Sequence, residues 1–100
     1  PAPTLAWYVN NVDRTMQTVL LPAYQLFNFR WEAVNAYSNG CNLSVWASWA
    51  PGGFWYAAVN LPAAWDWDGP ISLNPGNYLY DMTCYGPRGS VRQSVALGIY

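Results

Sequence analysis

The chain has 100 residues, the size of one domain with a small core. Hydrophobic residues make up 53% of it and aromatic residues 18%, whereas charged residues make up only 9%, far below the usual fraction of about 25%. The net charge of −1 excludes nucleic acid and anionic membrane surfaces from the expected partners. A small core cannot enclose seven Trp and eight Tyr side chains. Several rings are therefore expected at the surface, as in binding or assembly sites.

The periodicity of the sequence predicts strands and no helix. Gly, Pro and Asn interrupt the chain about every eight to twelve residues, which is typical of a β-sandwich or barrel. In chain order, strands are expected at residues 4–10, 16–21, 24–34, 41–47, 54–61, 71–73, 78–84 and 91–99. Residues 62–68 are expected to form a loop. The predicted fold class is therefore an all-β sandwich of about seven strands, with residues 1–100 as a single domain.

Alternation along three of these strands separates an inner from an outer face. The side chains expected in the core are Phe27, Phe29, Trp31, Cys41, Leu43, Val45, Tyr78, Tyr80, Met82 and Cys84. Trp46 follows Val45 and should face outward, which makes it a candidate interface anchor. The alternative is an edge Trp that lies flat on its own sheet.

Two cysteines, Cys41 and Cys84, fit one disulfide. In a domain of this size a disulfide indicates an oxidising compartment, so we expect a secreted or cell-surface protein. The alternative is a pair of buried free thiols. The chain opens without Met, and we expect it to be a processed mature chain or a piece of a longer one.

Further aromatic residues are candidate binding or interface residues. Trp49, Trp55 and Tyr56 join Trp46 in an uncharged stretch of the chain. Trp7 and Tyr8 are neighbours on the first strand, and one of the two rings should be exposed because adjacent strand residues face opposite ways. An outward ring on a terminal strand can dock on a neighbouring subunit. The alternative is an ordinary edge strand.

The segment Trp65-Asp66-Trp67-Asp68 adds two Trp rings and two carboxylates. If it is extended, the rings face one way and the carboxylates the other. One hypothesis is a carbohydrate platform, in which the rings stack on sugars and the carboxylates accept hydrogen bonds from hydroxyls. A second is a weak Ca²⁺ site, for which two carboxylates are few. A third is a loop whose Trp residues close the end of the sandwich.

The C-terminal third of the chain resembles a known family. Residues 75–90 read PGNYLYDMTCYGPRGS, and a strand rich in Val follows them. This Tyr-rich strand, Thr-Cys, Gly-x-x-Gly-Ser hairpin and Val-alternating last strand resemble the ending of bacterial immunoglobulin-like domains of surface and secreted proteins. Upstream, Phe29-Arg30-Trp31 followed by Cys41 looks like the Trp strand and first Cys of that family. The resemblance implies an immunoglobulin-like β-sandwich with adhesive, spacing or ligand-binding uses.

The sequence departs from the resemblance in two places. Trp31 precedes both cysteines, whereas antibody-type domains have their core Trp between them, so the bridge need not join the two sheets. Residues 46–67 are rich in Trp, whereas the family has a short polar stretch there. The family offers a scaffold without catalytic residues to transfer.

Catalysis and membrane insertion find little support in the sequence. The chain has no His and no Lys, which excludes Ser-His and Cys-His nucleophile systems and Schiff-base chemistry. Asp66 and Asp68 are the remaining pair of carboxylates, but an extended segment places both on one side. The longest apolar run, residues 54–59, is far shorter than the roughly 20 residues that span a bilayer. We therefore predict no enzyme, cofactor, metal or membrane insertion.

Three hypotheses for function follow. The first is a structural or adhesive module that packs against copies of itself, or against neighbouring surface-protein subunits, in a filament, sheath or array. The second is a carbohydrate-binding module for a polysaccharide, with stacking candidates Trp46, Trp49, Trp55, Trp65 and Trp67. The third is an engineered binder on an immunoglobulin-like scaffold, diversified between residues 46 and 68.

Overall fold

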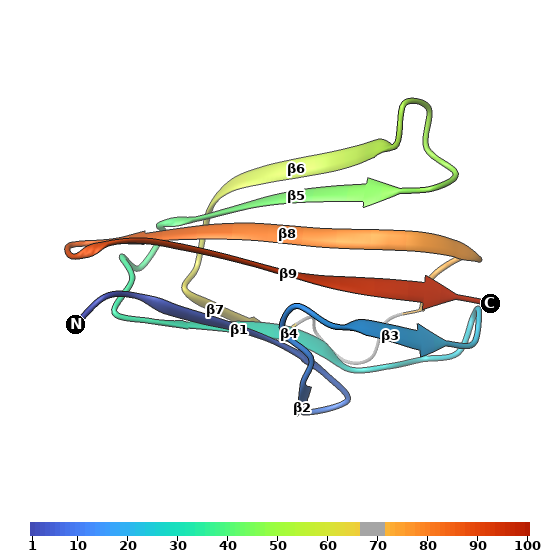
Figure 1. The fold of residues 1–100 in the computed structure, drawn as a ribbon, viewed down its shortest axis with the longest axis horizontal. Coiled ribbons are helices and arrows are strands. Elements are labelled where there is room, and N and C mark those ends of the chain that lie inside the picture. Colours follow the sequence, from blue (N-terminus) through green and yellow to red (C-terminus); the bar gives the residue numbers. More distant parts are fainter. Residues whose placement is uncertain (67–71) are drawn as a thin grey trace.

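The computed structural model describes residues 1–66 and 72–100, and in this part of the chain it is all-β, with two sheets (Figure 1). One sheet, of order β2-β1-β4-β7, contains β1 (Thr4–Val9), β2 (Val12–Asp13), β4 (Phe29–Val34) and β7 (Ala64–Asp66). The other, of order β3-β9-β8-β5-β6, contains β3 (Thr18–Leu21), β5 (Cys41–Ala47), β6 (Phe54–Leu61), β8 (Gly76–Gly86) and β9 (Gly89–Ile99). Neighbouring strands are antiparallel except β3 and β9, which are parallel.

Aromatic side chains from both sheets meet in the core. Trp7 on β1 stacks on Phe29 on β4, with ring centroids 5.3 Å apart. Tyr80 on β8, in the other sheet, places its ring centroid 4.8 Å from Phe29 and 6.0 Å from Trp7. The indole N–H of Trp7 donates to the carbonyl of Gln93 on β9 at 3.1 Å. The inner faces of the two sheets are therefore joined by ring packing and by a hydrogen bond.

The strand faces predicted by alternation are confirmed. All ten side chains assigned to the core are buried: Phe27, Phe29, Trp31, Cys41, Leu43, Val45, Tyr78, Tyr80, Met82 and Cys84. Burial raises the pKa of Tyr80, with a further contribution from the nearby Tyr56 and Tyr78. Its hydroxyl therefore stays neutral at physiological pH.

The predicted disulfide between Cys41 and Cys84 is confirmed. The two residues are paired across β5 and β8, which are neighbours in the five-stranded sheet. The bridge is thus a link within one sheet and not between the sheets. It is compatible with the oxidising environment of an extracellular protein.

Two predicted strands begin later than expected. The strand expected at residues 16–21 begins at Thr18, because Met16 has a φ of 60° and belongs to a turn. The strand expected at residues 24–34 begins at Phe29, because Tyr24 has a φ of 61° and the chain crosses between the sheets before it. Residues with positive φ are uncommon in strands, so neither Met16 nor Tyr24 belongs to the strand that follows it.

The segment between β6 and β8 also differs from the prediction. Residues 62–68 were expected to be a loop, but Ala64–Asp66 forms β7, which pairs with β4. Residues 72 and 73, expected in a short strand, lie in none. The described residues hold more strands than the expected seven or so, because the short β2 and β7 add to the longer ones. They contain no helix long and apolar enough to cross a membrane.

Candidate functional site

A row of apolar side chains crosses the outer face of the five-stranded sheet. Trp46 on β5 is paired with Phe54 on β6 and with Leu79 on β8. Leu79 is paired in turn with Ala96 on β9. We call the set formed by these side chains and their neighbour on β3 the apolar strip: Leu20, Trp46, Phe54, Leu79 and Ala96. The strip draws one side chain from each of the five strands.

The apolar strip is open to solvent. Trp46, Phe54 and Leu79 keep 42%, 44% and 40% of their surface exposed. Leu20 is 70% exposed, and it lies over the backbone of Gly98, since its Cδ2 atom is 2.7 Å from where a Cβ on Gly98 would stand. Side chains of this size on one sheet face form a patch of the kind that marks an interaction site.

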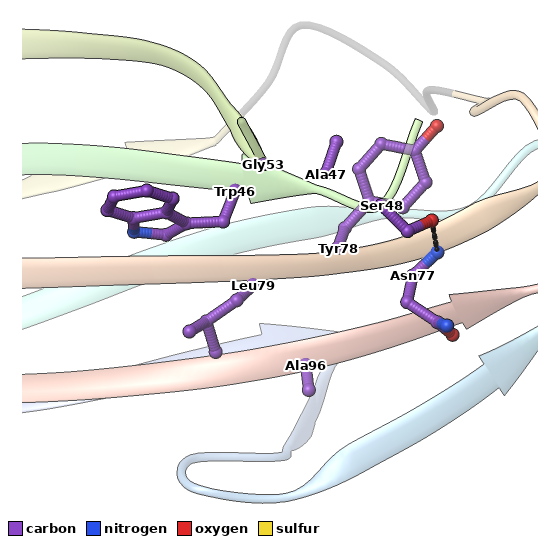
Figure 2. A pocket seen from close by; sticks show the side chains of 8 residues that line it. All are labelled: Trp46, Ala47, Ser48, Gly53, Asn77, Tyr78, Leu79 and Ala96. Atoms are coloured by element: carbon purple, nitrogen blue, oxygen red, sulfur yellow. Dashed lines mark hydrogen bonds between the residues drawn. The ribbon is translucent and has the colours of Figure 1, made fainter. Parts of the chain in front are cut away.

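A shallow groove of about 350 Å³ runs along the apolar strip. Figure 2 shows Trp46, Leu79 and Ala96 on three neighbouring strands beside it. At one end, the hydroxyl of Ser48 accepts a hydrogen bond from the backbone N–H of Asn77 at 2.9 Å. The other lining residues are Ala47, Gly53 and Tyr78. The groove therefore offers mainly apolar contacts, with polar groups at one end.

Polar residues border the apolar strip on its other side. The next row of the sheet pairs Ser44 with Asp81 and Asp81 with Ser94. Asp81 accepts hydrogen bonds from the guanidinium of Arg92, with an Nε–Oδ2 distance of 3.0 Å, and this contact raises the pKa of Arg92. The ion pair neutralises both charges at the edge of the patch. An apolar centre with a polar rim is the usual anatomy of a protein interface.

A second aromatic group lies where β5 turns into β6. The ring centroids of Trp49 and Trp55 are 5.1 Å apart, and those of Trp55 and Tyr56 are 5.2 Å apart. The indole N–H of Trp49 donates to the hydroxyl of Tyr78 at 2.8 Å, and that hydroxyl donates to the carbonyl of Asn74 at 2.8 Å. Burial raises the pKa of Tyr56. These contacts fix the rings in place and brace the end of the sheet.

The outer face of the four-stranded sheet has a different character. The guanidinium of Arg30 lies 3.8 Å from the ring centroid of Tyr8 and 3.4 Å from the carboxylate of Glu32. Charged and polar side chains thus cover the centre of this face. The two outer faces differ in polarity, and the five-stranded sheet carries the aromatic one.

The predicted interface residues differ in how far the structure exposes them to solvent. Trp46 faces outward, as predicted, and Trp49 is 46% exposed. Trp55 and Tyr56 are half-buried and pack against the core. Trp7 is fully buried, so the prediction that it contributes to a binding surface is wrong. Its neighbour Tyr8 takes the outer position of β1.

The Trp-Asp segment is only partly described. The backbone of Trp65 and Asp66 lies in β7, paired with Trp31 and Arg30 of β4. Trp67 and Asp68 lie outside the described residues, so the proposed carbohydrate platform and Ca²⁺ site lie largely outside them too. Within residues 1–66 and 72–100, no three potential metal-ligating side chains gather.

Four members of the apolar strip are not among the interface residues that the sequence predicts: Leu20, Phe54, Leu79 and Ala96. For Leu79 the sequence does indicate an outward position, because it lies between the core residues Tyr78 and Tyr80 on an alternating strand. The other members depend on cross-strand register, which a single sequence does not reveal.

Comparison of the chain with protein-family models, with curated proteins and with solved structures found no match.

Proposed function

We propose that this domain is a non-catalytic extracellular module, structural or adhesive, that self-associates through the apolar strip. The observation that carries the proposal is a row of apolar side chains across β6, β5, β8 and β9, mostly exposed, with the exposed Leu20 of β3 beside it. At about 25 cal/mol per Å² of apolar surface removed from water, covering such a patch is strongly favourable. A binding partner that buries the apolar strip therefore gains a hydrophobic contribution to its binding free energy, which is absent while the strip is exposed in the monomer.

The charge distribution supports a second copy as the occupant. The chain carries a net charge of −1, so two copies repel each other weakly. Near the strip, Asp81 and Arg92 already neutralise each other. An apolar patch without a net local charge can face its own copy without a like-charge contact. It equally suits a filament in which each copy covers part of its neighbour.

An immunoglobulin-like scaffold is part of this proposal. The segment that carries the family resemblance folds as the β8–β9 hairpin, in which Gly86 is paired with Gly89. Its alternate residues Tyr78, Tyr80 and Cys84 are buried between the sheets. A two-sheet scaffold closed by a long hairpin supports a rigid outer face, and rigidity lowers the entropic cost of association.

The test is the assembly state of the non-reduced protein over a wide concentration range, by sedimentation velocity and negative-stain electron microscopy. Wild type should form larger species as its concentration rises. Leu79→Ser should shift association to at least roughly tenfold higher concentration. Leu26→Ser is the matched control, because Leu26 is 64% exposed but lies outside the strip. A wild-type protein that stays monomeric throughout would refute the proposal.

Carbohydrate binding is the second candidate function, and the polar end of the groove favours it. Trp46 offers a ring for stacking, while Ser48 and Asn77 stand at the other end of the same groove. The test is titration of Trp fluorescence with cellulose, xylan and chitin fragments, in wild type and in Trp46→Phe. Binding lost in Trp46→Phe would support this function, and no change in wild type would exclude it for these glycans.

An engineered binder is a weaker candidate. Such a binder would place its diversified residues in loops. Much of the described part of residues 46–66 belongs instead to β6 and β7.

A further inference from the structure

Strand β6 forms an edge of the five-stranded sheet. It pairs with β5 on one side and, within residues 1–66 and 72–100, with no strand on the other (Figure 1). It is also the longest of the described edge strands, with eight residues against two in β2, four in β3 and three in β7. A free edge exposes backbone donors and acceptors that another strand can satisfy.

β6 lacks two of the features that protect such edges in monomeric proteins, namely charged residues and Pro. Its sequence is FWYAAVNL, without a charged residue and without Pro. Natural edge strands usually carry Lys, an inward charge or Pro to prevent pairing with another chain. The pairing with β5 shifts register between Phe54 and Tyr56 and again between Ala58 and Leu61, where Asn60 has a φ of 57°. The regular part of this uncharged edge is therefore residues 56–58, with Ala57 at its centre.

The hydrogen-bonding direction of the edge follows from the neighbouring strand. In β5, the N–H of Ala47 donates toward Gly53, on the β6 side, and the N–H of Ser48 donates to Asn77, on the β8 side. By this alternation the backbone of Ser44, four residues before Ser48, points to β8. Ala57 is the partner of Ser44 in β6, so its own N–H and C=O point away from β5, to the free edge.

We infer that β6 is where a second copy of this chain attaches, by antiparallel pairing of the two β6 strands across a two-fold axis near Ala57. This inference rests on the proposed self-association and adds to it a second contact, at the edge of the sheet. Ala57 is exposed and small, so two backbones can approach closely there. Each copy gives its N–H and C=O to the other, and the pair joins two five-stranded sheets into one.

The same pairing extends the apolar strip across the interface. Phe54, at the end of the strip, and Val59, 65% exposed, lie on either side of Ala57. With Ala57 of each copy opposite the other, Val59 lies opposite the partner's Trp55 and Phe54 opposite the partner's Asn60, and the reverse contacts are identical. Because β6 has no charge, no like charges face each other. Self-complementarity of this kind favours a second copy over an unrelated strand.

The test is the dimer dissociation constant, from sedimentation velocity, of variants at Ala57. Ala57→Lys places two like charges opposite each other and should raise the constant at least roughly tenfold. Ala57→Pro removes the N–H that faces the free edge, a substitution that edge strands tolerate, and should have the same effect. Ser38→Lys, in an exposed turn, is the charge-matched control. Circular dichroism and urea unfolding verify that each variant is folded.

Two outcomes separate this inference from the proposed function. If wild type and both Ala57 variants associate equally, the β6 contact is wrong while self-association stands. If the Ala57 variants are monomeric and Leu79→Ser still dimerises, the β6 contact is right and the apolar strip is not the interface. A wild-type protein that is monomeric throughout overturns both.

Discussion

Cys41 and Cys84 face each other directly across β5 and β8, with their Cα atoms 4.1 Å apart. This spacing is that of a non-hydrogen-bonded pair, the position where antiparallel side chains are closest. Both residues are fully buried. The disulfide therefore fixes the register of the two central strands that carry Trp46 and Leu79.

Removal of the disulfide should weaken the fold without changing it. The bridge closes a loop with a sequence separation of 43, so Cys41→Ala with Cys84→Ala should lower the free energy of unfolding by about 2–4 kcal/mol. Urea unfolding measures this value. Wild type in reductant is the control and should move toward the double variant. An unchanged midpoint would show that the register is held by packing alone.

The two tryptophans of opposite exposure should respond differently to truncation. Trp7→Ala should cost about 3–5 kcal/mol of unfolding free energy, because Trp7 is fully buried and fills the space between the sheets. Trp46→Ala should cost less than about 1 kcal/mol while it reduces self-association. Urea unfolding and sedimentation of both variants test the distinction. Equal losses of stability would contradict the assignment of Trp46 to an interface.

The fold should lose stability at alkaline pH. The pKa of the buried Tyr80 hydroxyl lies above its ordinary value of 10.0, and burial also raises the pKa of Tyr56. The unfolded chain thus releases these protons at lower pH than the folded chain. The stabilisation is complete below about pH 10 and declines as the pH rises above it. Urea unfolding across this range should show the decline, and a smaller one in Tyr56→Phe. A flat profile would contradict it.

Two glycines in the five-stranded sheet should tolerate a methyl group very differently. A Cβ on Gly86 would clash with the backbone oxygen of Asn35, so Gly86→Ala must displace the main chain. It should cost roughly 1–3 kcal/mol of unfolding free energy. A Cβ on Gly98 would be too close only to the flexible end of Leu20, so Gly98→Ala should cost less. Thermal and urea unfolding compare them, and the reverse order would show that the Asn35 segment yields easily.

Alternation predicted the faces of strands that carry a regular pattern. Phe29 and Trp31 alternate with charged neighbours, so the side facing the core was clear from the sequence. Trp7 and Tyr8 are both aromatic, and alternation alone cannot choose between them. In the structure Trp7 takes the core position, where its indole stacks on Phe29 and donates a hydrogen bond to the carbonyl of Gln93.

Other features depend on contacts between distant parts of the chain. β7 follows Pro62 and has no alternating pattern, and its pairing with β4 defines it as a strand. The apolar strip joins residues 20, 46, 54, 79 and 96, which only the order and register of five strands bring together. Composition indicated surface aromatics, but their position is a property of the fold.

The placement of the disulfide also sets how the domain responds to mechanical load. The two ends of the chain lie at opposite ends of the long axis, so a pull between them runs along the strands (Figure 1). Residues between Cys41 and Cys84 are shielded, because the bridge carries tension directly from β5 to β8. At about 3.5 Å per residue, the disulfide prevents roughly 150 Å of extension of the segment between Cys41 and Cys84. Under force, only the segments before Cys41 and after Cys84 could extend, so the total extension of the domain would be limited.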